Sequence, residues 1–455
     1  MIPWARWRRR PPAAPFALRL GLVAALGAIL RLGYVLLVQD TAISDDGIVY
    51  HLGGIALARG DGVVNPLTGT PTAIHPPGWT MLLALPSLLR ATSILAHQIV
   101  ACLVGTATIM LVGLAGRAVS GPRVGLVAAT LAAVYPNFWA WERELASETL
   151  VLPLVAAALI LSYRFWTAPR LGTLSALGAI CGLLVLVRAE QVLLLAVLLL
   201  PLVLLAKGLT PRRRLGWFVV ACATAAVVVA PWVVYNTGRF ENPVILTTSL
   251  GVNLRGGNCP GSYYGEHLGH LDPDVWTYHD DRDRCRFLAF GRGDESEKDV
   301  VFREAALEYA RDHAARLPIV VTARQGRTWG VFRPLQQAHF DRDWGRSSIW
   351  VYRAGLVGYW TLLLAGIAGG IVLRRRGAPI FPLLSFVVVV AVATAVTWGQ
   401  TRFRAPAEPA IVVLAAVSID VVLRCVRSAR GRRSRRRSGG HERRLRGTRL
   451  TTTPW

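Results

Sequence analysis

Two adjacent carboxylates, Asp45 and Asp46, follow closely after the first apolar segment of the chain. Apolar residues recur at helical spacing over 48–58, so we expect an amphipathic helix that lies flat on a membrane surface. A carboxylate held there could take the proton of an acceptor hydroxyl, which is a poor nucleophile near neutral pH. A simple N-cap role is the alternative. Asp45 is the first candidate for such a base, and Asp46 is the second.

Cationic side chains are expected near these carboxylates, at the outer ends of later apolar segments. Guanidinium groups match the oxygens of a phosphate, and such donors stabilise the negative charge that develops on a phosphate leaving group. The candidates are Arg188, Arg402, Arg404 and His75. For each arginine the alternative is a side chain that reaches toward lipid headgroups. For His75 the alternative is a structural hydrogen bond in a proline-rich turn.

Two glutamates, Glu148 and Glu190, begin apolar segments on the same side of the membrane. They are expected to orient the arginines or a bound sugar, although pairing with the helix dipole explains them equally well. The neighbouring sequence Glu142-Arg143-Glu144 is predicted to form a solvated ion-pair cluster.

Transmembrane helices are the elements that would position these residues. The chain of 455 residues is 53% hydrophobic and only 17% charged, whereas about 25% of the residues of a soluble domain are charged. Apolar runs near the roughly 20 residues that cross a bilayer recur along the chain. We therefore predict an all-α polytopic membrane protein with about ten transmembrane helices. The predicted spans are 16–38, 95–114, 124–141, 149–163, 171–187, 191–206, 217–235, 352–373, 380–398 and 406–423.

The net charge of +24 is unevenly distributed. Residues 236–350 hold 15 basic and 16 acidic residues, so the basic excess lies in the other connections and in the C-terminal tail. Lys and Arg favour cytoplasmic loops, and this distribution argues against a nucleic-acid partner. If the short run 77–89 does not cross, all the basic connections face the cytoplasm. The sequence therefore predicts a plasma-membrane protein with both termini cytoplasmic and the acidic pair outside.

This topology divides the chain into five parts. They are a basic cytoplasmic N-terminus (1–15), an N-terminal transmembrane region (16–235) with the first outer loop (39–94), an extracytoplasmic loop domain (236–350), C-terminal transmembrane helices (351–424) and a basic disordered cytoplasmic tail (425–455).

Two side-chain expectations follow from this topology. Cys259 and Cys285 both fall in the long outer loop, where a disulfide between them and two free thiols are open alternatives. Arg31, inside the first span, is expected to reach the membrane surface.

Several short motifs occur in a characteristic order and all fall on the predicted outer side. They are Asp45-Asp46, His75-Pro76-Pro77, Tyr135-Pro136, Ser147-Glu148, Val187-Arg188-Ala189-Glu190, Pro231-Trp232 and Thr401-Arg402-Phe403-Arg404-Ala405-Pro406. This order resembles the GT-C superfamily of membrane glycosyltransferases over about 16–424. The similarity is to the polyprenyl-phosphate-sugar group, which includes dolichyl-phosphate-mannose protein mannosyltransferases and the lipid A aminoarabinose transferase (family 39/83-like). The chain departs from that pattern in its Asp-Asp pair, where Asp-Glu is common, and in Ala189, where proline is usual.

The resemblance implies an inverting transfer of a mannose-like or pentose-like sugar from a polyprenyl-phosphate donor. The acceptor would be a hydroxyl of a glycan, glycolipid or protein at the outer face of the bilayer. No cofactor is implied; a divalent metal between Asp45 and Asp46 is the less favoured alternative. His267 and His270 have no third ligand nearby in the sequence. A transporter or flippase for a lipid-linked sugar, and a non-catalytic scaffold, are the competing functions.

Overall fold

A computed structural model describes residues 14–38, 43–272, 293–345 and 347–447 of the chain. These residues form helices and loops, with one isolated bridge between Val64 and Pro71. The N-terminal helices are α1 (Ala14–Leu37), α2 (Asp45–Arg59), α3 (Gly78–Leu88), α4 (Ile94–Ser120), α5 (Pro122–Val134), α6 (Pro136–Glu144), α7 (Glu148–Thr167), α8 (Leu171–Val185), η2 (Ala189–Leu193), η3 (Leu195–Leu199), α9 (Leu200–Leu204) and α10 (Pro211–Asn236). The remaining ones are α11 (Leu250–Gly257), α12 (Pro260–Tyr263), α13 (Glu295–Asp312), η5 (Ala314–Arg316), α14 (Leu317–Thr328), α15 (Pro334–Gly345), α16 (Ile349–Arg375), α17 (Phe381–Val396), η6 (Thr401–Ala407) and α18 (Glu408–Gly447).

Six described helical segments are long and apolar enough to cross a membrane, and the bent pair α5–α6 would make a seventh. The six are Pro15–Leu37, Ile94–Ser120, Glu148–Thr167, Pro211–Asn236, Ile349–Arg375 and Thr401–Ser428. Three other predicted spans coincide with shorter apolar helices, at Leu171–Val185, Ala189–Leu204 and Phe381–Val396. A helix of 15 residues such as α8 rises only about 22 Å, less than the hydrocarbon core of roughly 30 Å. The all-helical, multi-span fold is therefore confirmed, while the count of ten spans stays a prediction.

The break between α5 and α6 explains how a charged side chain is accommodated inside the bundle. Pro136 has no N–H to donate to the carbonyl of Ala132, and the two helices meet there at an angle of 46°. Arg31 donates from Nη2 to Ala132 O and from Nη1 to Ala133 O, at 3.1 Å each, and from Nε to Glu142 Oε1 at 2.7 Å. Arg31 is therefore buried, and the expectation that it reaches the membrane surface is wrong.

Close helix packing depends on small residues at the interfaces, as is common in membrane proteins. A Cβ on Gly125 of α5 would collide with the backbone carbonyl of Gly113 in α4. A Cβ on Gly178 of α8 would likewise collide with the carbonyl of Ala221 in α10. These contacts fix the relative rotation of neighbouring helices, and the rotation decides which side chains meet at the ends of the bundle.

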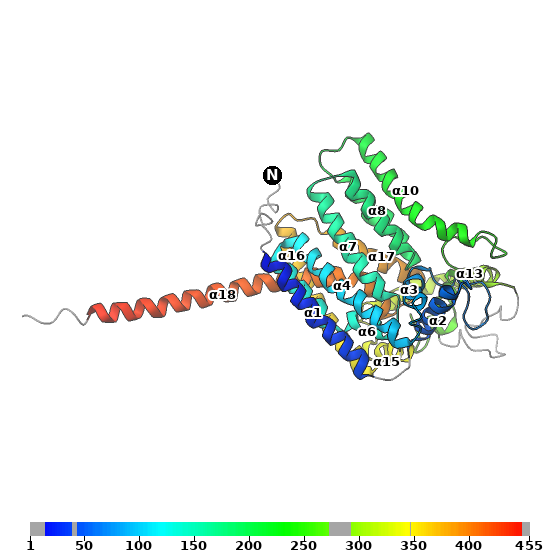
Figure 1. Ribbon diagram of the computed structural model, residues 1–455, viewed down its shortest axis with the longest axis horizontal. Coiled ribbons are helices and arrows are strands. Elements are labelled where there is room, and N and C mark those ends of the chain that lie inside the picture. Colours follow the sequence, from blue (N-terminus) through cyan, green and yellow to red (C-terminus); the bar gives the residue numbers. More distant parts are fainter. Residues whose placement is uncertain (1–13, 39–42, 273–292, 346, 448–455) are drawn as a thin grey trace, which may run out of the picture.

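One end of the bundle gathers the short helices of the polar segments (Figure 1). There α2, α3 and α13 lie together, at the end opposite the start of α1 and the projecting part of α18 (Figure 1). The predicted helix over 48–58 is present as α2, and the run 77–89 is the 11-residue helix α3. This end carries the candidate site residues.

Candidate functional site

The start of α2 is fixed against the end of α6. Ser44 caps α2 by accepting a hydrogen bond from Gly47 N at 2.9 Å, and its hydroxyl donates to Glu144 O at 2.9 Å. A side chain on Gly47 would collide with the same carbonyl, so the helix approaches α6 as closely as a glycine allows. Successive residues of a helix point about 100° apart. As a result Asp46 lines a cavity, whereas Asp45 is exposed beside it.

Asp46 is held by an arginine from the other end of the chain. Arg402 donates from Nη2 to Asp46 Oδ2 at 2.7 Å and from Nε to Glu148 Oε1 at 3.1 Å. The Glu148 side chain is fully buried at the start of α7. Helix α2, helix α7 and the turn η6 therefore meet at one guanidinium group.

A second arginine extends the same network. Arg188 donates from Nη1 to Glu148 Oε1 and from Nε to Glu190 Oε1, both at 2.6 Å. Glu148 thus accepts from two guanidinium groups through one oxygen. The result is a continuous chain of ion pairs, which we call the charged cluster: Asp46, Arg402, Glu148, Arg188 and Glu190.

The protonation of the cluster follows from its neighbours. Burial acts to raise the pKa of Asp46, but the charged neighbours Arg402, His75 and Arg188 together outweigh burial and lower that pKa to about 2. The pKa of His75 is lowered because burial outweighs the attraction of Asp46. His75 is therefore neutral near pH 7, and its Nε2 lies 3.8 Å from Asp46 Oδ1, too far for a hydrogen bond.

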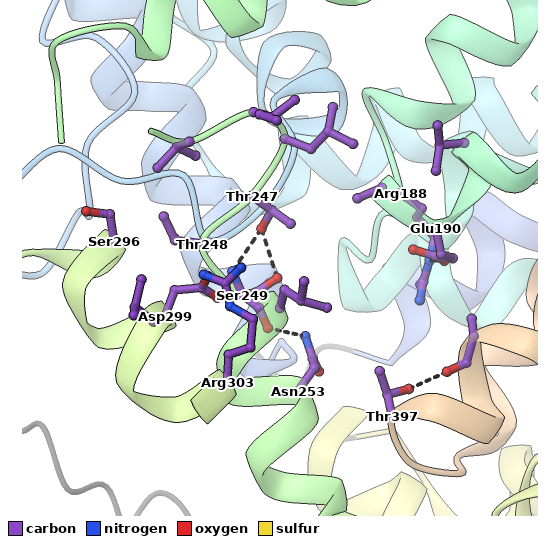
Figure 2. A pocket seen from close by; sticks show the side chains of 18 of the residues that line it. Arg188, Glu190, Thr247, Thr248, Ser249, Asn253, Ser296, Asp299, Arg303 and Thr397 are labelled. Atoms are coloured by element: carbon purple, nitrogen blue, oxygen red, sulfur yellow. Dashed lines mark hydrogen bonds and ion pairs between the residues drawn. The ribbon is translucent and has the colours of Figure 1, made fainter. Parts of the chain in front are cut away.

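The charged cluster faces two adjoining cavities. The smaller, of about 180 Å³, is lined by Asp46, Arg402, His75 and the Arg188–Glu190 turn. The larger, of about 530 Å³, shares Arg188, Glu190 and Phe403 with it. Figure 2 shows the larger cavity with Arg188 and Glu190 on one side and Ser296, Asp299 and Arg303 of α13 on the other. Its remaining wall includes apolar residues of α17.

Arg404 lies apart from this site. It donates from Nε to Glu408 Oε1 at 2.8 Å and from Nη1 to Thr328 O at 3.0 Å, and its guanidinium lies over the ring of Tyr359. The side chain is only 2% exposed and does not line either of the two cavities. The structure therefore brings together Asp46, His75, Arg188, Arg402 and both glutamates, but not Arg404.

Residues 142–144 were predicted to be solvated, and the structure corrects this. All three side chains are buried because α6 packs among α4, α7 and α16. Glu142 pairs with Arg31, and Glu144 Oε1 accepts a hydrogen bond from Tyr352 at 2.7 Å. Charged residues between two apolar runs resemble a solvent-exposed turn in sequence, and only the packing distinguishes the two cases.

Sequence reasoning missed the aromatic residues of the smaller cavity. Tyr50 stands four residues after Asp46, on the same face of α2, and its ring centre lies 4.8 Å from that of His75. The i, i+4 spacing could have indicated it. Trp344, Trp398 and Phe403 also line this cavity, and no local pattern points to them.

Two further expectations concern metals and cysteines. Within the described ranges, no group of three or more His, Cys, Asp or Glu side chains is placed to hold a metal ion. Cys259 is buried, but Cys285 lies outside the described residues, so their pairing stays a prediction.

The central segment of the chain is similar in sequence to a known family. Residues 74–235 match the family model described as dolichyl-phosphate-mannose-protein mannosyltransferase. The resemblance to a membrane glycosyltransferase family that the motifs predicted is thereby confirmed. The matched segment contains His75, Glu148, Arg188 and Glu190, whereas Asp46 and Arg402 lie on either side of it. No curated protein sequence gives a significant match to the chain.

Solved structures of an archaeal oligosaccharyltransferase share the fold. The apo oligosaccharyltransferase of Archaeoglobus fulgidus aligns with a TM-score of 0.53 and 16% identity, over 91% of this chain and 51% of that one. The archaeal oligosaccharyltransferase AglB from the same organism, in complex with an inhibitory peptide and a dolichol-phosphate, gives 0.53 and 16%, over 92% and 51%. ArnT from Cupriavidus metallidurans, bound to undecaprenyl phosphate, gives 0.44 and 16%, over 90% and 78%. The chain thus spans about half the length of the oligosaccharyltransferases it matches.

Proposed function

We propose that this protein is a glycosyltransferase that moves a sugar from a polyprenyl-phosphate donor to an acceptor hydroxyl at the outer face of a membrane. The observation that carries the proposal is the charged cluster, because two arginines and a cavity-lining carboxylate adjoin a cavity with an apolar wall. The family match over 74–235 and the shared fold support the same class of reaction.

The two cavities suit an amphiphilic donor. Val390 and Ala393 of α17 line the larger cavity, which offers apolar surface for the first isoprene units. The phosphate would lie where the cavities join, at Arg188, and close to Arg402. A guanidinium has five N–H donors; Arg188 uses Nε and Nη1 for carboxylates, and Arg402 uses Nε and Nη2. Both arginines therefore keep donors for a phosphate.

Asp46 is the better candidate for the base because it lines the smaller cavity, whereas Asp45 is exposed. In the free protein its low pKa keeps it ionised but makes it a weak proton acceptor. A bound phosphate adds negative charge and competes for the N–H donors of Arg402. Both effects raise the pKa of Asp46 toward the range in which general bases work well.

In the transfer step, the acceptor oxygen would bond to the anomeric carbon while the bond to the phosphate oxygen breaks. The acceptor proton would pass to Asp46, and the electron pair would leave on the polyprenyl phosphate. Arg188 and Arg402 would stabilise that leaving charge. A direct displacement of this kind inverts the anomeric configuration.

The test is sugar transfer by the purified protein in liposomes, with mannosyl, arabinosyl and aminoarabinosyl polyprenyl phosphates as donors. We expect Asp46→Asn to lower the transfer rate by roughly 10²- to 10⁴-fold, the usual contribution of a general base. Asp45→Asn is the matched control and should stay within a few-fold of the wild type. If Asp45→Asn lost transfer and Asp46→Asn kept it, Asp45 and not Asp46 would be the base. Absence of transfer from every donor, together with transbilayer movement of a lipid-linked sugar, would favour a flippase.

A further inference from the structure

The smaller cavity has an aromatic part that the proposed chemistry does not yet use. Trp344, Trp398 and Phe403 line it together with the charged cluster. Trp398 comes from the connection after α17, Phe403 from η6 and Trp344 from α15 in the long polar segment. Three separate stretches of chain therefore bring aromatic rings to one small cavity.

Trp398 is held rigidly from several sides. Its indole N–H donates to Asn253 Oδ1 at 3.1 Å. Its ring packs edge-on against Phe403, with ring centres 4.6 Å apart, and the ring of His270 lies at 5.3 Å. The side chain is only 6% exposed. Trp398 thus acts as support, and it offers little of its own surface to a ligand.

Trp344 is the less buried of the two tryptophans that line the cavity. Its ring centre lies 6.4 Å from that of Trp398, at an angle of 33° between the ring planes. It packs against the buried group of Cys259, Leu271 and Trp398 but is itself only half-buried. Trp344 therefore lines the smaller cavity with a ring that its neighbours cover only in part.

The aromatic group adjoins the phosphate-side arginines. The Arg188 guanidinium lies 5.3 Å from the centre of the Phe403 ring, within the range of a cation–π contact. Phe403 is also the residue that follows Arg402 in the chain. In a polyprenyl-phosphate sugar, the ring is joined to the phosphate through a single oxygen. A phosphate bound by Arg188 and Arg402 therefore places the sugar ring beside these aromatic residues.

We propose that Trp344, supported by Trp398, is the platform on which the sugar ring of the donor packs. This inference rests on the proposed function and assigns a specificity-determining residue within it. The C–H face of a pyranose is apolar and flat, and it packs well on an indole, while its hydroxyls face polar groups such as Glu190 and His75. The platform would select donors whose sugar presents an unbroken C–H face.

The test measures binding of two ligands to the detergent-solubilised protein: polyprenyl phosphate, and the same lipid carrying mannose. Trp344→Leu should weaken binding of the sugar-bearing lipid by about tenfold, the upper range for an aromatic packing contact, and leave polyprenyl phosphate unaffected. Trp344→Phe, which keeps a ring, should restore most of the affinity. Trp350→Leu is the matched control, since Trp350 is 70% exposed and lines neither cavity.

Each other outcome is decisive. An equal loss for both ligands would show that Trp344 contacts the lipid, and unchanged binding of both would leave it a packing residue; either result overturns the proposal. If Trp344→Leu does not fold, Trp344→Met, which also lacks a ring but has a more flexible apolar side chain, takes its place with the same expected outcomes. A wild-type protein that binds neither ligand would overturn the proposed function as well, whereas one that binds both equally would overturn only the platform.

Discussion

Arg402 and Arg404 stand two residues apart in the turn η6, and the structure gives them different surroundings. Arg402 lines the smaller cavity and bridges Asp46 and Glu148. Arg404 is buried between Glu408 and the ring of Tyr359. A 3₁₀ turn has three residues per turn, so side chains two positions apart point about 240° apart. Identical residue types in one motif therefore have separate surroundings, and we propose a chemical task for Arg402 and a structural one for Arg404.

The environments differ in a way that predicts different responses to mutation. The Arg404–Glu408 pair is almost fully buried, at 2% and 3% exposure, so loss of one partner leaves an uncompensated charge in the bundle. Arg402 faces a cavity, so in a variant that lacks this arginine water can solvate part of the carboxylates it contacts. The Arg404–Glu408 pair should therefore matter for stability, and Arg402 should matter for turnover.

The largest effect is expected for Arg404→Ala. Breaking a buried ion pair typically costs about 3–5 kcal/mol of unfolding free energy. The buried Glu408 carboxylate would lose its cationic partner and keep the hydrogen bond from Asn137. Thermal unfolding in detergent measures this loss, and Arg404→Ala combined with Glu408→Ala should recover part of it. Normal thermal stability with weakened donor binding would instead return Arg404 to the phosphate-binding role that the motif suggested.

Arg402→Ala should act on the reaction and much less on stability. Removing one preorganised donor to a developing charge typically lowers kcat by about 10²- to 10³-fold. Arg402→Lys keeps the charge, but an ammonium cannot reproduce the planar fork that joins Asp46 to Glu148, so we expect an intermediate loss. Transfer kinetics and thermal unfolding, measured on the same preparations, separate the two effects. Unfolding of Arg402→Ala as severe as that of Arg404→Ala would erase the distinction between the two arginines.

The smallest expected effect is a pH dependence of stability that comes from Asp46 in the charged cluster. The pKa of Asp46 is lowered to about 2, so its stabilising contribution is complete above the ordinary value near 3.9 and disappears as the pH falls through 2. Asp46→Asn should lack this contribution at every pH. The difference in melting temperature between wild type and Asp46→Asn should therefore be constant above pH 5 and shrink below pH 4. A difference that shrinks between pH 7 and pH 5 would contradict the low pKa.

Local patterns predicted most of the helices. Apolar runs placed α1, α4, α7, α10 and α16 within a few residues, except that α4 ends six residues later and α10 begins six residues earlier than predicted. Spacing alone predicted the short helix α2 after the acidic pair. The run of Glu142 to Glu144 was misjudged, because a broken span with a buried polar end has the same composition as an exposed turn.

The sequence by itself determined the helical, multi-span character of the protein and its resemblance to a glycosyltransferase family. These properties depend on composition and short-range order, which a single chain displays directly. Only the tertiary structure decided that Asp46 rather than Asp45 lines the cavity, that Arg402 rather than Arg404 joins it, and that Trp344 stands beside it. Those choices depend on the rotation of each element about its axis, and contacts such as Gly47 against Glu144 set that rotation across about 100 positions of sequence.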